Sequence, residues 1–124
     1  MLNPRGLGSI ALAAAETEYF DCGHYQEGFD VLELHLAGTL VTGAVVVATL
    51  QVSADGVTYY DAKMVDLTNG TDTGTLVASL TKAATFTRTI LRLAAIAPWV
   101  RLKLDNSGGG AAATITGDVF ALID

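Results

Sequence analysis

A thiol and an imidazole lie two residues apart in the segment Asp21-Cys22-Gly23-His24. Residues i and i+2 of an extended chain point to the same side, so these two groups could meet. A cysteine nucleophile also needs a base within hydrogen-bond reach and a third group that orients the base. Because a cysteine and a histidine this close in sequence are a common coincidence, we expect an idle thiol. We predict no catalytic residue and no enzymatic activity.

Oxygen ligands occur around Gly70, where Asp66, Asn69 and Asp72 could surround a cation. This spacing does not follow the EF-hand loop, and the bidentate glutamate that ends such a loop is absent. We therefore expect a solvated turn, with a calcium site as the alternative.

Other metal and cofactor chemistry lacks its usual residue sets. The two histidines, His24 and His35, have only Cys22 as a further zinc ligand of the usual type. The run Gly108–Gly110 has no following Lys-Ser or Lys-Thr pair and precedes no expected helix, so it is not a phosphate loop. We predict no bound metal and no cofactor.

Three aromatic residues, Tyr59, Tyr60 and Trp99, could form a platform on which the apolar face of a sugar would stack. Trp99 alternates with Val100 and shares a strand face with Arg101, so at least one aromatic ring is expected at the surface. Packing in the core or between subunits is the favoured alternative.

The composition describes a single domain of 124 residues with an acidic balance of −6. Seven scattered basic residues cannot neutralise a nucleic-acid backbone, and no apolar run reaches the length of a membrane-spanning helix. Hydrophobic residues make up 51% and charged residues only 16%, well below the usual quarter. Part of the surface is therefore expected to be covered by other subunits, with a small self-sufficient sandwich as the alternative.

Alternating apolar residues predict β-strands through most of the chain. Two strands show a period of two clearly, around Leu34 and around Leu102. Asp55-Gly56 predicts a tight type I′ hairpin turn. Residues 59–63 are expected to continue the same sheet after the turn, with residues 64–67 as a further candidate for that sheet. The segment 106–110 is expected to be a flexible hairpin tip. Seven to nine strands at this spacing predict an all-β, antiparallel β-sandwich of jelly-roll type over residues 17–124.

Residues 1–16 are expected to form an extended N-terminal arm ahead of the sandwich. Pro4 and Gly6 interrupt any regular element, and Gly8 interrupts the apolar stretch, so a cleaved signal peptide is not expected. Such an arm lies either on a neighbouring subunit or on the edge of its own sandwich. The single Cys22 excludes an internal disulfide and indicates a reducing compartment or stabilisation by oligomerisation.

Two segments carry a resemblance to known proteins: Val52-Ser53-Ala54-Asp55-Gly56-Val57-Thr58-Tyr59-Tyr60-Asp61 and Pro98-Trp99-Val100-Arg101-Leu102-Lys103-Leu104. This pair of strands resembles small β-sandwich structural proteins of tailed bacteriophage particles, in chains of about this length. It resembles more weakly the discoidin-like modules that bind carbohydrate or lipid. Those modules are usually longer and are often closed by terminal cysteines, which this chain lacks.

The phage resemblance implies a virion component assembled in the host cytoplasm, of the capsid decoration (cement) type. It implies that the partner is the major capsid protein or another virion subunit, and that the chain forms a homo-oligomer, with a trimer favoured. The alternatives are a carbohydrate-binding module or a tail or neck component. The residues expected to contact partners are Leu2, Asn3, Pro4, Arg5, Leu7, Ile10 and Leu12 of the arm, and Glu33, His35, Arg101 and Lys103 of the sandwich.

Overall fold

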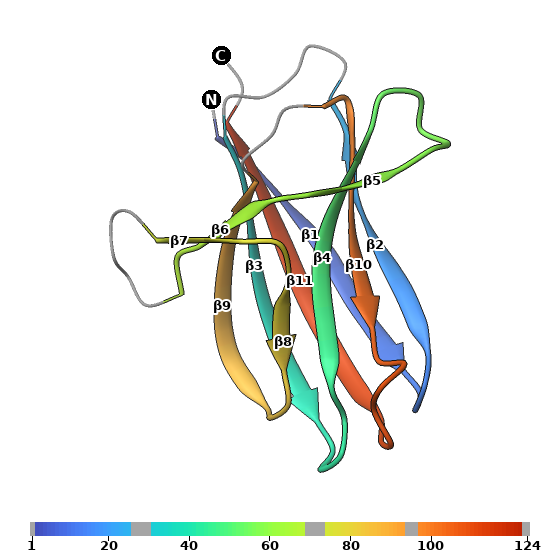
Figure 1. Cartoon of the computed structure of the whole chain (residues 1–124). Coiled ribbons are helices and arrows are strands. Elements are labelled where there is room, and N and C mark those ends of the chain that lie inside the picture. The colour runs from blue at the N-terminus through green and yellow to red at the C-terminus, as the bar shows by residue number, and fades with distance from the viewer. Residues whose placement is uncertain (1, 26–30, 69–73, 94–96, 123–124) are drawn as a thin grey trace.

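The computed structural model describes residues 2–25, 31–68, 74–93 and 97–122, and within these ranges it contains eleven strands and no helix. Two antiparallel sheets pack face to face, which confirms the predicted all-β sandwich (Figure 1). No helix in these ranges is long and apolar enough to cross a membrane.

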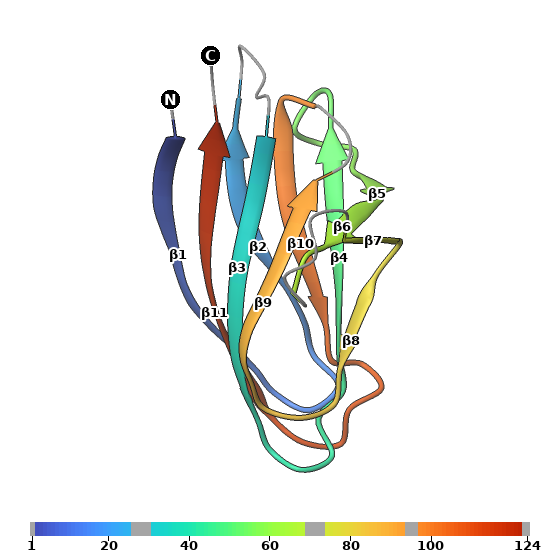
Figure 2. The same cartoon turned by 90° about the vertical axis from the view of Figure 1, so that its left-hand side faces the viewer.

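One sheet has six strands, which run in the order β1-β11-β3-β9-β6-β7 (Figure 2). Their bounds are β1 Leu2–Leu12, β11 Ala113–Leu122, β3 Val31–Leu40, β9 Phe86–Leu93, β6 Met64–Asp66 and β7 Thr75–Val77. The other sheet has the order β2-β10-β4-β5, and β8 also pairs with β4. The bounds of these strands are β2 Thr17–His24, β10 Trp99–Asp105, β4 Val46–Ser53, β5 Tyr60–Ala62 and β8 Leu80–Lys82.

The core lies between the two sheets and follows the alternation of the sequence. Leu32, Leu34 and Leu36 of β3 face Val100, Leu102 and Leu104 of β10, and all six are at most 4% exposed. Each fully buried side chain of this size contributes about 1.5–3 kcal/mol relative to exposure. The residues between them lie on the two outer faces of the sandwich, where any partner must bind.

The N-terminal segment lies on the edge of its own sandwich as a regular strand that includes Pro4 and Gly6, contrary to the expectation that these residues would interrupt any regular element. β1 pairs with β11 from Leu2↔Leu122 to Leu12↔Ala113, with a bulge between Gly6 and Gly8. No strand in the described ranges pairs with the other side of β1. A bulge and a proline are common features of edge strands, because both discourage uncontrolled pairing.

The chain changes sheets after Ala62, which corrects the expectation that residues 64–67 continue the same sheet as residues 59–63. β5 pairs with β4 in one sheet, whereas β6 pairs with β9 in the other. Nothing in the local sequence marks this crossing, because no glycine or proline interrupts the segment.

The Asp55-Gly56 turn is wider than the predicted two-residue hairpin. β4 ends at Ser53 and β5 begins at Tyr60, and only Gly56 of the pair has a positive φ, of 78°. The Asp55 carboxylate accepts hydrogen bonds from the backbone N–H groups of Val57 (2.8 Å) and Thr58 (2.9 Å). These bonds lower the pKa of Asp55, with the bond from Thr58 the largest cause. A self-bonded loop over residues 54–59 therefore replaces the type I′ turn.

The segment 106–110 is anchored at its start and is not simply a flexible tip. The Asn106 side chain is fully buried, accepts a hydrogen bond from Val45 N–H (3.1 Å), and donates to the carbonyls of Ala13 (3.0 Å) and Ala111 (2.9 Å). Gly109 is also buried, and its carbonyl accepts from Ala15 N–H. Asn106 thus joins three connections at one end of the sandwich.

Candidate docking surface

An arginine lies between two tyrosine rings on the outer face of the sheet formed by β2, β10, β4 and β5. The guanidinium carbon of Arg101 is 4.2 Å from the ring centre of Tyr19 and 3.9 Å from that of Tyr59. We call these three residues the Arg101 stack. Tyr19 comes from β2, Arg101 from β10, and Tyr59 from the end of the 54–59 loop. Both tyrosine rings therefore make a favourable cation–π contact with the same guanidinium.

A chain of hydrogen bonds holds the stack from the side of β4. Arg101 Nε donates to Gln51 Oε1 at 2.8 Å, and Gln51 Nε2 donates to Asp61 Oδ1 at 2.9 Å. These three residues are direct neighbours in the β10-β4-β5 register, and Gln51 is only 8% exposed. The register of three strands therefore fixes the orientation of the guanidinium.

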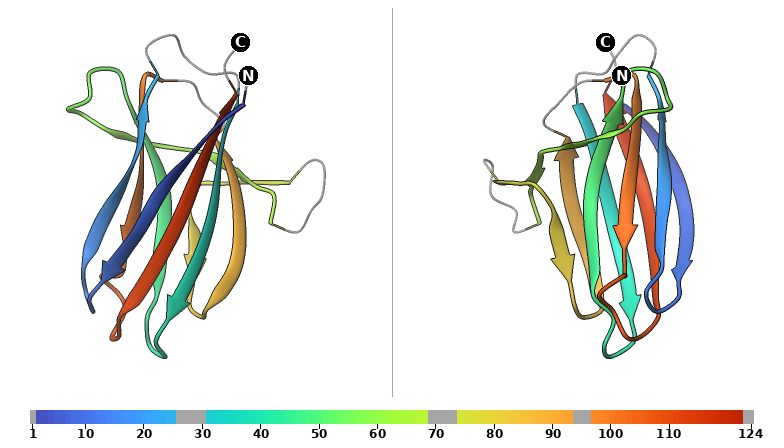
Figure 3. Two further views of the ribbon diagram at one scale, coloured as in Figure 1. Left: turned by 180° about the vertical axis from the view of Figure 1, so that it is seen from behind. Right: turned by 45° about the vertical axis from the view of Figure 1, so that its right-hand side comes forward.

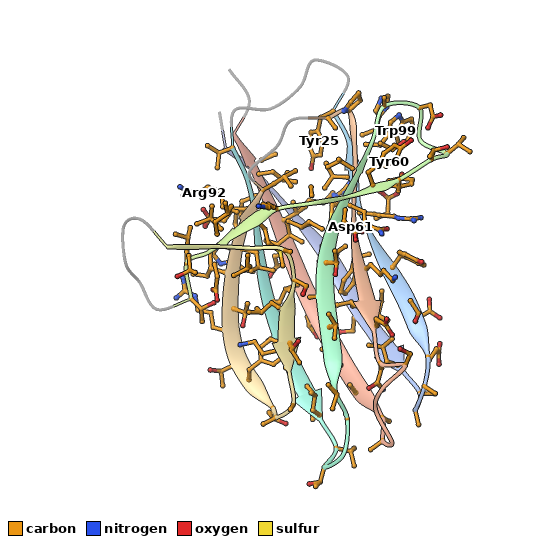
Figure 4. All side chains as sticks on the ribbon, viewed as in Figure 1. Tyr25, Tyr60, Asp61, Arg92 and Trp99 are labelled. Carbon is orange, nitrogen blue, oxygen red and sulfur yellow. The ribbon has the colours of Figure 1, made fainter. Side chains whose placement is uncertain are left out.

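A second stacked pair lies at the end of the same face. The His24 and Trp99 rings are 3.8 Å apart at an interplanar angle of 7°. Gly56 approaches the indole so closely that a Cβ placed there would lie 2.8 Å from Trp99 Cε2. Figure 4 shows Trp99 and Asp61 near this end of the sandwich, beside the 54–59 loop.

A groove of about 420 Å³ adjoins the Arg101 stack along the open side of the sandwich. It lies between the edge strands β1 and β2, which run along the same side of the molecule (Figure 3). Tyr19 belongs to both features, so the stack and the groove form one continuous surface. The groove is lined by Arg5, Gly6, Leu7, Ile10, Tyr19, Phe20 and Asp21.

The outer face of the six-stranded sheet carries a different cluster. Glu33 accepts hydrogen bonds from His35 Nε2 at 2.8 Å and from Arg92 Nη2 at 2.9 Å. Partial burial opposes ionisation of Glu33, but these bonds outweigh it and lower the pKa of the carboxyl. The ring of His35 also contacts Phe120, with ring centres 4.6 Å apart.

The structure places the predicted contact residues in the β1–β2 groove, in the core and on the two outer faces of the sandwich. Arg5, Leu7 and Ile10 line the β1–β2 groove. The side chains of Leu2, Asn3 and Pro4 are outside the part of the chain whose side chains the structure describes. Leu12 is only 1% exposed, so it is a core residue and cannot contact a partner in the folded protein, contrary to the prediction.

The row of Glu33, His35, Arg101 and Lys103 is not one surface. Glu33 and His35 lie on the outer face of the six-stranded sheet, and Arg101 and Lys103 lie on the outer face of the other. The core of the sandwich separates the two pairs, so a single flat partner cannot contact all four.

The predicted aromatic platform is not assembled as one flat surface. Trp99 lies on the outer face, as expected, but it is stacked with His24, and one side of Tyr59 is covered by Arg101. Tyr60 is opposite Val52 in the register, so it lies on the other side of β5 from Asp61, and it is 67% exposed.

The Cys22 thiol lies in the core. Cys22 is fully buried, and burial raises its pKa to about 12, whereas the ring of His24 is stacked on Trp99. Among the described residues, no group of His, Cys, Asp and Glu could hold a metal ion. Of the proposed calcium ligands, Asn69 and Asp72 lie outside the described residues, and Asp66 accepts a hydrogen bond from Thr68.

Sequence reasoning missed Tyr19 and Gln51 as parts of this surface. Each is an ordinary outward-facing residue of its strand, and only the pairing of β2 and β4 with β10 brings both to Arg101. The alternation of β10 indicated that Arg101 would face outward. It could not indicate the residues beside it.

Comparison with known proteins shows a shared fold. No family model matches the chain, and no curated protein is similar in sequence. The SPBc2 prophage-derived protein YomS has a similar structure, with a TM-score of 0.53 and 15% identity over 97% of this chain and 95% of that one. PirA is similar at a TM-score of 0.55 and 11% identity, over 95% of this chain and 91% of that one.

Part of a larger xylanase chain has a similar fold. The CBM22-1-GH10 modules of the Clostridium thermocellum endo-1,4-beta-D-xylanase 10B, complexed with xylohexaose, give a TM-score of 0.51 at 9% identity. This similarity covers 99% of our chain and 26% of that one.

Proposed function

We propose that this chain is a structural subunit of a tailed-phage particle, a decoration protein that binds the outside of the head and stabilises the shell. The observation that carries the proposal is the continuous surface of the Arg101 stack and the β1–β2 groove. Tyrosine, tryptophan and arginine are enriched in the binding centres of protein interfaces, and an edge strand offers unpaired backbone groups to a neighbour.

Three further observations support this role. The low content of charged residues fits a protein whose surface is partly covered. The sandwich resembles a prophage-derived protein over nearly all of both chains. The resemblance of the two strand segments to small phage structural proteins points the same way.

The mechanism would be stabilisation by preferential binding. A subunit that binds only the assembled shell stabilises that state by mass action. A trimer that bridges several shell subunits would gain avidity, because the second and third contacts form at high effective concentration.

The test combines the mass of the purified protein with binding to undecorated heads of the phage that encodes it. We expect a homotrimer in native mass spectrometry, saturable co-sedimentation with heads, and heads that resist heating better when decorated. A protein that binds no head would contradict the decoration role. A ring of six or more copies, or binding to tails alone, would favour a tail or neck component.

A deletion of residues 2–15 is not a clean test of the N-terminal segment. β1 is an integral edge strand, and the deletion would remove Leu12 from the core. Arg5→Ala is a milder change, because Arg5 is exposed and donates to the carbonyl of Asp21 at 3.1 Å. Lower head affinity with an unchanged melting temperature would support a role for the β1 edge.

The second candidate is a glycan-binding module, supported by the exposed Tyr60 and by the fold shared with the xylanase modules. It is the weaker candidate, because Tyr59 and Trp99 already use a ring face within the chain. Saturable, sugar-specific signals on a glycan array would favour it, whereas a decoration protein should show no sugar preference.

A further inference from the structure

We propose that Arg101 is the binding site for a carboxylate presented by an acidic side chain on the protein to which this chain docks. The inference deepens the proposed docking role and rests on it for the identity of the partner. The carboxylate chemistry itself can be tested on the isolated protein.

The geometry leaves one edge of the guanidinium available. The rings of Tyr19 and Tyr59 lie 4.2 and 3.9 Å from its central carbon, and Nε donates to Gln51. Among the described residues, no side chain accepts a hydrogen bond from the two terminal nitrogens of Arg101, and no carboxylate forms an ion pair with it. A guanidinium carries five N–H donors in a fixed plane, so four of them remain for an external acceptor.

A carboxylate is the group that matches this arrangement. Two parallel N–H donors in one plane fit its two oxygens, and such bidentate pairs are among the strongest hydrogen-bonded contacts in proteins. The stack also holds the long side chain in one conformation before the partner arrives, which reduces the entropy lost on binding.

A protein carboxylate fits better than a phosphate polymer. Asp21 is opposite Arg101 in the β2–β10 register, and Asp61 is linked to it through Gln51. These two acids, together with the net charge of −6, would repel a polyanion such as nucleic acid. A single carboxylate carries one negative charge and is repelled less than a polyanion, and exclusion of water by the surrounding tyrosines strengthens its contact with the guanidinium.

The test uses the full-length, ¹⁵N-labelled protein and follows the Arg101 Nε–Hε resonance by NMR. The probes are N-acetyl-glutamate and N-acetyl-glutamine, each with its α-carboxyl group blocked as the N-methylamide so that the glutamine analogue is neutral, and inorganic phosphate. We expect a saturable shift with N-acetyl-glutamate, none with the glutamine analogue, and at least tenfold weaker binding of phosphate. A shift that does not saturate, or phosphate binding as tight as that of the carboxylate, would overturn the proposal.

Variants separate the effect of the planar N–H donors of Arg101 from the effect of its charge. Arg101→Lys keeps the charge but loses the planar donors, and backbone amide shifts should show at least tenfold weaker binding of N-acetyl-glutamate. Lys103→Ala, on the same face, is the matched control and should bind within twofold of the parent. Tyr59→Leu keeps the guanidinium and removes one of the two rings that contact it. We expect severalfold weaker binding of N-acetyl-glutamate, and this variant tests the site even if Arg101→Lys folds poorly. Unchanged binding in both stack variants would refute the role of Arg101.

Head binding distinguishes the two proposals. If heads bind Arg101→Lys as well as the parent, the carboxylate site is wrong and the decoration role stands. If the carboxylate binds and no head does, the decoration role is wrong and the site stands.

Discussion

The imidazole of His24 lies parallel to the indole of Trp99, with ring centres 3.8 Å apart and planes inclined by 7°. The two residues are cross-strand neighbours at the end of β2 and β10. Gly56 of the 54–59 loop lies against the same indole. Trp99 therefore connects that loop to the β2–β10 strand pair, at the position where Trp99 is opposite His24. Since Trp99 is the only tryptophan of the sequence, its fluorescence reports on this junction alone.

Gly56→Ala should displace Trp99 and destabilise the protein. The new Cβ would lie 2.8 Å from the indole, and φ is +78°. Gly8→Ala is the matched control, because Gly8 has a φ of +82° with no atom within 4 Å of its Cβ position. Both variants carry the backbone cost of about 1–2 kcal/mol. Only Gly56→Ala should add a packing cost and shift the emission spectrum. Equal losses in the two variants would show that the indole contact is loose.

Gly109→Ala should disturb the buried hydrogen bonds of Asn106. A Cβ at Gly109 would collide with Asn106 Oδ1, and it would lie 2.8 Å from the backbone nitrogen of Val45. We expect a loss of about 1–3 kcal/mol in the free energy of unfolding, measured by urea denaturation. Gly108→Ala has open space around the new Cβ and should change stability by less than about 0.5 kcal/mol. A neutral Gly109→Ala would indicate that this end of the sandwich adjusts easily.

The Cys22 thiol should be unreactive in the folded protein. Its pKa is raised from 9.0 to about 12 by burial, so the thiolate population near pH 8 falls about a thousandfold relative to a free cysteine. Labelling with Ellman's reagent should therefore be slow in buffer and fast in urea. Rapid labelling of the native protein would mean that β2 opens readily.

The same shift predicts a loss of stability in base. The folded state holds the thiol proton more tightly, so the stabilising contribution is complete below pH 9.0 and is lost as the pH rises toward 12. The free energy of unfolding should fall by up to about 1.4 kcal/mol per pH unit in that window. Cys22→Ala lacks this slope, so the difference between the two proteins isolates it. Parallel curves would contradict the prediction.

The Glu33 cluster predicts a dependence on pH in acid. Because the pKa of Glu33 lies below 4.5 in the folded state, its stabilising contribution is present above pH 4.5 and is lost as the pH falls. Glu33→Gln should cost about 0.2–1 kcal/mol at neutral pH and low salt, since the Arg92 side chain is 44% exposed and water screens the pair. The difference from the parent should shrink toward pH 3 and in 1 M salt. Asp118→Asn, on the same face, should lower the free energy of unfolding by less than Glu33→Gln does. An equal loss in the two variants would contradict the prediction that the ion pairs of Glu33 cause the effect.

Patterns with a period of two predicted the fold class and much of the core, because burial on one face of a strand leaves a direct trace in the sequence. The alternation around Leu34 and Leu102 is the clearest case. The 54–59 loop was misjudged, because the Asp55 carboxylate bonds to the backbone and favours a wider turn. The role of Asn106 was missed, because a loop-type residue next to glycines gives no local sign of burial.

The candidate site was predicted only in part, for a different reason. Arg101 and Tyr59 stood among the candidate residues, but their relation depends on the order of strands from β2 to β5. Strand pairing brings residues 19 and 51 beside Arg101, and the 54–59 loop adds Tyr59. Strand order is a property of the whole chain, so no local pattern could bring these four together.

The pairing of Leu2 with Leu122 places the two ends of the described chain side by side (Figure 1). A short linker could therefore join the two ends of the described chain, and new ends could be opened at the exposed Ser107 and Gly108 on the opposite end of the sandwich. Such a circular permutant would keep every strand while moving a fused cargo from one pole of the molecule to the other. The fold therefore allows a fused cargo to be displayed at either end of the sandwich.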